Sequence, residues 1–227
     1  MVRAVTFDVG YTLVQRRIFP PERWFADVCR LAGVSVTPDA ALEGARARKR
    51  FEVAHPDSRV NPITQEWLRG RTIAGFRAAG VVGGIDELLG RFRLAESKVP
   101  AGWALDPDVP AILEALRQRG VRLGVVSNWN ATLRSDLKSL GVGGYFDAII
   151  DSASAGADKP DTRIYDLACA ALDVDAEQCV HVGDSPPHDV VMADAIGATP
   201  VLYDPLNCLD STCVRIARLM ELVDVLG

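Results

Sequence analysis

The sequence contains no apolar run that approaches the ~20 residues of a membrane-spanning helix. It also lacks a secretory signal pattern, because its first apolar run is short and ends at Asp8. Cysteine is scarce and forms no C-x-x-C pair; the five residues are Cys29, Cys169, Cys179, Cys208 and Cys213. We therefore expect a cytoplasmic protein with reduced thiols and no contact with a membrane.

Positive charge is too sparse and scattered to indicate a nucleic-acid partner. The formal net charge is −5, and the one dense basic run, residues 46–50, is short and lacks interleaved aromatics, so we expect a solvated helix face there. The charge is uneven, however. Residues 16–98 hold 15 Lys and Arg against 10 Asp and Glu, and the rest of the chain holds 10 against 20. Either two surfaces simply differ, or a basic segment draws anions towards an acidic, cation-binding remainder.

What the sequence does contain is a regular alternation of strands and helices. With 227 residues, 48% of them hydrophobic, the chain can bury a full core and carry a smaller insertion. Beyond residue 106, apolar runs at 121–126, 148–150, 179–182 and 200–203 predict strands. Amphipathic stretches between them predict helices, and a terminal helix is expected over 214–223. This alternation is typical of an α/β fold, a Rossmann-like parallel sheet with helices on both faces.

Residues 16–98 show helical periodicity and no strand. Trp24, Val28 and Leu31 form one helical stripe, and Leu89 and Phe92 belong to another. Stretches near 40–53 and 64–79 also predict helices, with breaks around 55–56 and 60–62, where prolines occur. We therefore expect a core domain made of residues 1–15 and 99–227, with an α-helical cap domain, residues 16–98, inserted after the first strand.

Four polar side chains of the core follow apolar runs or tight turns. They are Asp8, Ser127, Lys159 and Asp184. Ligands of open α/β sheets bind at the carboxyl ends of the strands, where such residues would converge. Taken alone, each has an ordinary explanation as a turn residue, a helix cap or an exposed lysine. Together they predict a site suited to phosphoryl transfer.

The chemistry of these residues fits that reaction. A strand-end carboxylate such as Asp8 can attack phosphorus, or an activated carbon, and form a covalent intermediate. Asp184 and Asp189 lie five residues apart after a tight turn and can supply one cation ligand and one supporting carboxylate. Ser127 and Asn128 offer a hydroxyl and an amide to an anionic oxygen.

In their order and spacing, these motifs resemble those of the haloacid dehalogenase (HAD) superfamily of hydrolases. They read D-x-x-x-T-L at 8–13, G-V-V-S-N at 124–128, G-x-x-K-P-D-x-R-I-Y at 156–165 and H-V-G-D-S-x-x-x-D-V at 181–190. The helical insertion falls where that family carries its small helical (C1) cap. The resemblance covers the whole core and implies a HAD-type fold and hydrolase activity.

The resemblance also implies a role for each matching position. Asp8 would be the nucleophile, and Lys159 would neutralise its charge and that of the intermediate. Thr12 and Ser127 would orient the phosphoryl oxygens. The implied set is Asp8, Thr12, Ser127, Asn128, Lys159 and Asp189 for catalysis and, for a bound Mg²⁺, Asp8, Asp184 and the backbone carbonyl of Gly10.

Gly10 departs from the family pattern. Family phosphatases have Asp at this position, and it protonates the leaving oxygen. Loss of such acid–base help slows a reaction by roughly 10²–10⁴-fold, about 3–5 kcal/mol of barrier. Activated substrates such as aryl or acyl phosphates would suffer least. Tyr11 and His188 are candidate substitutes, although side chains without a catalytic role are simpler explanations for both.

Three functions remain open. The first is a Mg²⁺-dependent phosphatase acting on a small anionic substrate, as a monomer or homodimer. The second is a 2-haloacid dehalogenase, a family that also lacks Asp at position 10 and uses residues matching Ser127, Asn128, Lys159 and Tyr165. Asp184 counts against it, because an extra carboxylate would repel an anionic haloacid. The third is a catalytically impaired binding or regulatory protein on the same fold. We expect the first.

Overall fold

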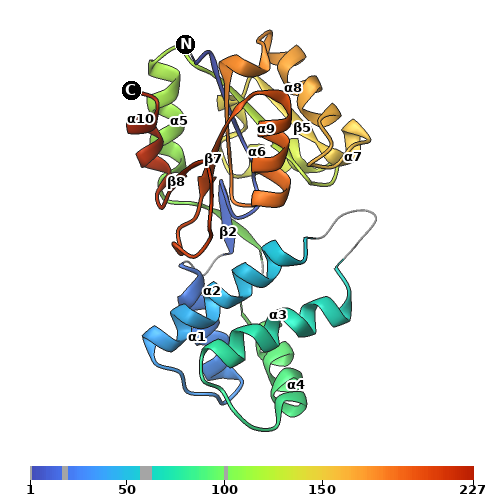
Figure 1. Cartoon of the computed structure of the whole chain (residues 1–227), viewed down its shortest axis with the longest axis vertical. Coiled ribbons are helices and arrows are strands. Elements are labelled where there is room, and N and C mark those ends of the chain that lie inside the picture. Colours follow the sequence, from blue (N-terminus) through green and yellow to red (C-terminus); the bar gives the residue numbers. More distant parts are fainter. Residues whose placement is uncertain (1, 17–19, 57–62, 100–101) are drawn as a thin grey trace. The chain divides into compact units, whose positions relative to one another are not determined.

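The computed structural model describes residues 2–16, 20–56, 63–99 and 102–227 (Figure 1). The chain divides into two compact units. One unit contains the residues up to 14 and those from 104 onward, and the other contains residues 15–103. Within the described residues no helix is long and apolar enough to cross a membrane.

The first unit is built on a six-stranded sheet in which every pairing is parallel. The order is β5-β4-β1-β6-β7-β8, with bounds β1 (Ala4–Phe7), β4 (Arg122–Ser127), β5 (Ala148–Asp151), β6 (Cys179–Gly183), β7 (Thr199–Tyr203) and β8 (Val214–Ile216). The predicted α/β fold with a parallel sheet is therefore confirmed. The strand order reverses at β1, with β4 on one side and β6 on the other, and such reversals create ligand sites at the carboxyl edge.

The helices of this unit follow from its amphipathic segments. They are α5 (Val109–Gln118), α6 (Leu133–Ser139), α7 (Ser152–Ala155), α8 (Arg163–Leu172), α9 (Val191–Ile196) and α10 (Leu222–Val225), with short helical turns η1 (Gly143–Tyr145), η2 (Ala176–Gln178), η3 (Pro186–Val190) and η4 (Leu219–Glu221). In α5, Ile112, Leu113 and Leu116 are fully buried, as the apolar stripe predicts. The α5 and α10 helices lie side by side in the view of Figure 1.

The predicted terminal helix over 214–223 is wrong in its first half. Val214–Ile216 forms β8, which pairs in parallel with β7. Within this strand only Ile216, 2% exposed, is buried, whereas Val214 is 47% exposed, as expected for a short strand at the edge of the sheet. Helical structure begins only at Leu219. Val214 and Ile216 are β-branched and pair with β7 at the edge of the sheet, and this pairing cannot be recognised from the spacing of apolar residues along the chain.

The second unit is helical, as predicted. It contains α1 (Pro21–Leu31), α2 (Pro38–Ala54), α3 (Gln65–Ala78) and α4 (Ile85–Glu96). Its core is aromatic. The centroid of the Phe92 ring lies 5.9 Å from that of the Phe25 ring and 5.1 Å from that of the Phe76 ring. The side chains of Thr37 and Thr64 cap α2 and α3. The predicted break around 60–62 lies outside the described residues.

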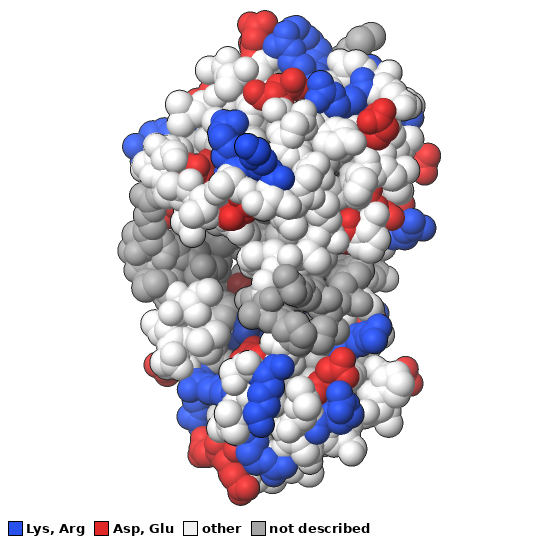
Figure 2. All heavy atoms as spheres, turned by 180° about the vertical axis from the view of Figure 1, so that it is seen from behind, with Lys and Arg blue, Asp and Glu red and all other residues white. Residues whose placement is uncertain are grey.

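The basic run at 46–50 is only partly the solvated face that the sequence predicts. Arg48 is buried, its guanidinium lies 4.9 Å from the ring centre of Trp24, and it pairs with Glu96 at 3.9 Å. Figure 2 shows that Lys and Arg lie among Asp and Glu on the visible described surface of each unit. One basic side chain of the run therefore serves the helical core rather than a charged surface.

The sequence analysis did not predict a small two-stranded sheet that the structure contains. β2 (Val14–Arg16) pairs with β3 (Trp103–Leu105), and the backbone N–H of Asp106 donates to the carbonyl of Leu13 at 2.9 Å. The two strands lie at the points of the sequence where one compact unit gives way to the other. Their three-residue length is too short to show a clear strand period.

Candidate active site

The strand-end residues meet at one edge of the parallel sheet. Asp8 follows β1, Ser127 ends β4 and Asp184 follows β6, and these three strands are neighbours. Lys159 reaches the same place from the segment between α7 and α8. The four residues are between 1% and 7% exposed. The structure therefore brings the charged and polar groups together in a largely desolvated site.

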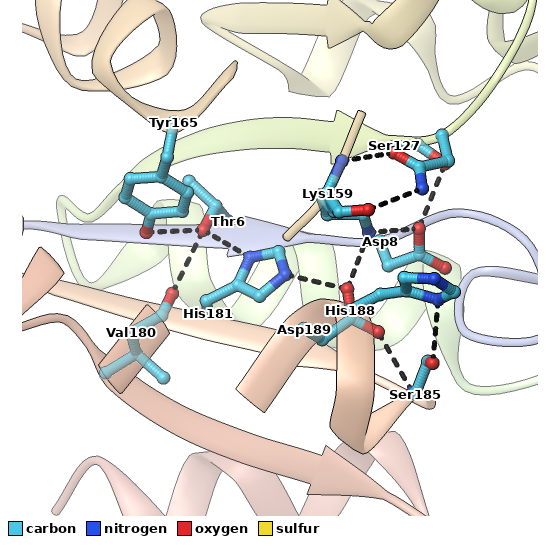
Figure 3. Close-up of polar contacts among 11 residues, drawn as sticks. Thr6, Asp8, Ser127, Lys159, Tyr165, Val180, His181, Ser185, His188 and Asp189 are labelled. Carbon is cyan, nitrogen blue, oxygen red and sulfur yellow. Dashed lines mark hydrogen bonds and ion pairs between the residues drawn. The ribbon is translucent and has the colours of Figure 1, made fainter. Parts of the chain in front are cut away.

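The two oxygens of Asp8 have different surroundings. Oδ1 accepts hydrogen bonds from Ser127 Oγ at 2.9 Å and Lys159 Nζ at 2.6 Å (Figure 3). Among the described residues, none donates a hydrogen bond to Oδ2. The Asp8 backbone N–H donates to the carbonyl of Val182 at 2.8 Å, which ties the carboxylate to β6. One oxygen is thus held in place while the other is left for a ligand or an electrophile.

Lys159 lies between two carboxylates. Its Nζ is 2.6 Å from Asp8 Oδ1 and 2.5 Å from Asp189 Oδ1. Burial by itself lowers the pKa of Lys159, but Asp189 and Asp8 outweigh it and raise the pKa above its usual value. Asn128 clamps the backbone of Lys159: Nδ2 donates to its carbonyl at 3.1 Å, and Oδ1 accepts from its N–H at 2.7 Å. In this structure Asn128 positions Lys159.

Asp189 is held by three donors. Its Oδ1 accepts hydrogen bonds from Lys159 Nζ and from His181 Nε2, the second at 3.1 Å. Its Oδ2 accepts a hydrogen bond from the backbone N–H of Ser185 at 3.0 Å. Burial raises the pKa of Asp189, but Lys159 and His181 outweigh it and hold the pKa well below its usual range. Asp189 therefore stays ionised and supports the ammonium from the side opposite Asp8.

These pKa shifts predict a pH dependence of stability. Because the pKa of Asp189 is lowered by folding, this carboxylate stabilises the folded protein at pH values above about 3.9, the pKa of Asp in an unfolded chain. The contribution is lost as the pH falls below that value towards the pKa of the folded state. The raised pKa of Lys159 stabilises it below about 10.4, and this contribution is lost at higher pH. Between about pH 5 and pH 10 the pair contributes fully.

Replacing Lys159 with methionine should lower the free energy of unfolding at pH 7 by about 3–5 kcal/mol, because the buried carboxylates of Asp8 and Asp189 lose their counter-charge. Urea unfolding in chelator at pH 7.0 and about pH 4.5 measures this effect. The variant should regain stability at the lower pH as the carboxylates protonate, whereas the wild-type protein should not. Equal pH dependence of the two proteins would contradict the ion-pair account.

The buried carboxylates form a candidate cation site. Asp8, Asp184 and Asp189 each place one ligand atom within 4.8 Å of the others. Asp8 and Asp189 both contact the ammonium of Lys159, and Asp184 adds a third buried carboxylate close to them, so the cluster offers several oxygen ligands in a small space. Hard cations such as Mg²⁺ prefer oxygen ligands. Because Asp189 is already committed to three hydrogen bonds, Asp8 and Asp184 are the carboxylates best placed to hold the ion.

The turn after Asp8 has two unusual features. Tyr11 has a φ of 62°, a left-handed conformation rare for a bulky residue, and its side chain is 36% exposed. Thr12 Oγ1 is buried and has no hydrogen-bond partner among the described residues. A buried hydroxyl without a partner costs stability. The hydroxyl that the sequence analysis expects to orient phosphoryl oxygens therefore makes no hydrogen bond to the described residues and is available to a ligand.

Position 10 adjoins Trp129, which the sequence analysis did not single out. A Cβ built on Gly10 would lie 3.5 Å from Cζ3 of Trp129, an ordinary contact. Trp129 Nε1 donates to Asp136 at 3.0 Å, which fixes the indole. The candidate acid His188 shares a hydrogen bond of 3.0 Å with Ser185. The space beside Gly10 is thus bordered by an aromatic ring.

The fold and site together define a class of hydrolase. A parallel sheet carries a carboxylate, a lysine, a hydroxyl and an acidic pair at its carboxyl edge, and a helical segment is inserted after the first strand. The sequence model of haloacid dehalogenase-like hydrolases matches residues 2–197, so the chain belongs to this family.

Individual relatives agree with that assignment. The haloacid dehalogenase-like hydrolase domain-containing protein 3 of Bos taurus is 35% identical over 204 residues, which cover 86% of this chain and 79% of the bovine protein. The ribulose-1,5-bisphosphate 5-phosphatase of Halopiger xanaduensis is 34% identical over 110 residues, which cover 48% of this chain and 46% of that phosphatase. The crystal structure of a HAD phosphatase from Thermococcus onnurineus matches with a TM-score of 0.62 and 25% identity, covering 100% of this chain and 98% of that one.

Proposed function

We propose that this hydrolase is a Mg²⁺-dependent phosphatase that acts on small anionic phosphates through an aspartyl-phosphate on Asp8. The observation that carries the proposal is the arrangement around this carboxylate. Its Oδ1 is fixed by Ser127 and Lys159, its Oδ2 receives no hydrogen bond from the described residues, and Asp184 lies beside it. Phosphoryl transfer depends mainly on positioning and charge neutralisation, and these groups supply both.

In this proposal Asp8 Oδ2 attacks phosphorus, and the bond between phosphorus and the leaving oxygen breaks. Water then attacks phosphorus, releasing phosphate and restoring the carboxylate. Lys159 offsets the negative charge of the aspartate and of the phosphoryl group, and Ser127 keeps the nucleophile oriented. Mg²⁺, when held by Asp8, Asp184 and the carbonyl of Gly10, supplies further positive charge for the phosphoryl oxygens.

Gly10 shapes the expected substrates. Without a carboxylic acid at this position, the leaving oxygen must take its proton from water, which favours leaving groups that are stable as anions. Aryl and acyl phosphates have such leaving groups. The phosphatases among the relatives, including a phosphoserine phosphatase of Thermus thermophilus that is 33% identical over 103 residues, support the reaction class. We therefore propose an activated phosphate as the preferred substrate.

Mg²⁺ should raise the melting temperature of the wild-type protein. At a concentration 100 times the Kd a ligand adds about 2.7 kcal/mol of stability, which corresponds to roughly 5–10 °C for a chain of this size. Replacing Asp184 with asparagine should remove the shift, whereas replacing the exposed Asp210 with asparagine should preserve it. Differential scanning fluorimetry with and without MgCl₂ measures both. An undiminished shift in the Asp184 variant would exclude this residue as a ligand.

A further inference from the structure

A chain of buried hydrogen bonds continues behind Asp189, away from the nucleophile. His181 Nε2 lies 3.1 Å from Asp189 Oδ1, and its Nδ1 lies 2.9 Å from Thr6 Oγ1. The Thr6 hydroxyl lies 2.8 Å from the hydroxyl of Tyr165 (Figure 3). Thr6 and Tyr165 are 0% exposed, His181 is 1% and Asp189 is 2%. Of these residues only Asp189 contacts a group of the proposed mechanism, the ammonium of Lys159.

The sheet explains why these side chains meet. Thr6 and His181 are register partners on the adjacent strands β1 and β6, so their side chains project from the same face. Tyr165 reaches them from α8, and its ring packs edge-on against the imidazole at a centroid distance of 5.6 Å and an angle of 86°. Three separate elements therefore fix one histidine.

The hydrogen bonds of His181 leave little freedom to its ring. Because Asp189 is ionised, it accepts, and Nε2 must donate. The Thr6 hydroxyl can either donate or accept, so it satisfies Nδ1 whichever form the ring takes. Tyr165 in turn shares a hydrogen bond with that hydroxyl. A buried network in which each member is satisfied holds its groups rigidly.

Asp189 needs such support because of its neighbours. A Cβ at Gly183 would overlap its carboxyl group, so the carboxylate lies directly against the backbone of β6. Its Oδ1 is shared between His181 and Lys159, whose Nζ also contacts Asp8. A rotation of this carboxylate would withdraw the ammonium from the nucleophile.

We propose that His181 is a positioning residue that holds the Asp189 carboxylate, and through it the Lys159 ammonium, in the geometry that the nucleophile requires. The inference deepens the proposed function, because it concerns the same Asp8. Thr6 and Tyr165 orient the imidazole for this role. The effect falls on the rate of the chemical step rather than on substrate binding, since none of the three need touch the substrate.

The test compares His181→Leu with His181→Gln, in which the amide nitrogen can stand in for Nε2. With p-nitrophenyl phosphate and Mg²⁺, the leucine variant should lose about 10- to 100-fold in kcat with little change in KM. Glutamine should restore a large part of the loss. Thr6→Val, which keeps the shape of the side chain without its hydroxyl, should lose about 3- to 10-fold, and Thr6→Ser should recover most of it.

Two further measurements separate positioning from stability and from failure of the proposed function. Melting temperatures show whether each variant is folded at the assay temperature. A crystal structure of His181→Leu should show Asp189 turned and the distance from Lys159 Nζ to Asp8 lengthened. Wild-type kcat in the leucine variant, or loss of kcat that follows melting temperature and is not restored by glutamine, overturns the inference. If the wild-type protein hydrolyses no phosphate, the proposed function fails, and the crystal structure alone decides the positioning role: an unmoved Lys159 overturns it.

Discussion

Replacing Asp8 with asparagine should abolish hydrolysis of p-nitrophenyl phosphate and acetyl phosphate, lowering kcat by more than about 10⁴-fold. The amide keeps the size of the side chain and can still contact Ser127, but it cannot attack phosphorus. The neighbouring Asp189 is bonded through both of its oxygens, so it does not offer an equivalent open oxygen. Steady-state assays with saturating Mg²⁺ measure the loss.

The same variant should remain folded. Removing Asp8 leaves Lys159 paired with Asp189 and reduces the number of clustered buried carboxylates, so the melting temperature in chelator should not fall far. Replacing the exposed Asp194 with asparagine provides a matched control that should retain full activity. Substantial turnover by folded Asp8→Asn would remove the nucleophile from the account.

Replacing Gly10 with aspartate should accelerate hydrolysis of alkyl phosphates by about 10- to 10³-fold, because it supplies the proton that a poor leaving group needs. The structure has room for the change. The added Cβ would meet Trp129 at an ordinary 3.5 Å, and the backbone of Gly10 lies outside the left-handed region that disfavours side chains. The gain should be much smaller for p-nitrophenyl phosphate, whose leaving group is stable without a proton.

The shape of that side chain must be separated from its acidity. Gly10→Asn places an isosteric amide beside Trp129 and should leave the rate on alkyl phosphates near the wild-type value. Initial rates on an alkyl and an aryl phosphate, for both variants, provide the comparison. Equal gains with asparagine, or no gain with aspartate on the alkyl substrate, would show that a missing proton donor does not limit this enzyme.

Local sequence pattern predicts most of the sheet because buried parallel strands are apolar throughout. The run at 121–126 emerges as β4 (Arg122–Ser127), and the run at 179–182 as β6 (Cys179–Gly183). The edge strand β8 could not be predicted in this way. Its three residues, Val214–Ile216, fit a helical stripe equally well, and only the edge of β7 determines their conformation.

The candidate site divides along the same line. Asp8, Ser127 and Asp184 could be brought together from sequence because each lies where a strand ends, and Lys159 was found through its motif. The roles of these residues stay predictions. His181 could not be found, because its contact with Thr6 requires β1 and β6 to be neighbours in a given register, which an alternation of strands and helices does not specify. A polar residue inside an otherwise apolar strand was the only signal.

Chemical trapping of the aspartyl-phosphate tests the central proposal most directly. The protein is quenched during turnover of acetyl phosphate and reduced with borohydride, which converts an acyl phosphate to an alcohol, and its peptides are analysed by mass spectrometry. We expect homoserine in place of Asp8, dependent on substrate and absent from the Asp8→Asn variant. Phosphate release with an unmodified Asp8, or reduction at Asp184 or Asp189 instead, would contradict the account.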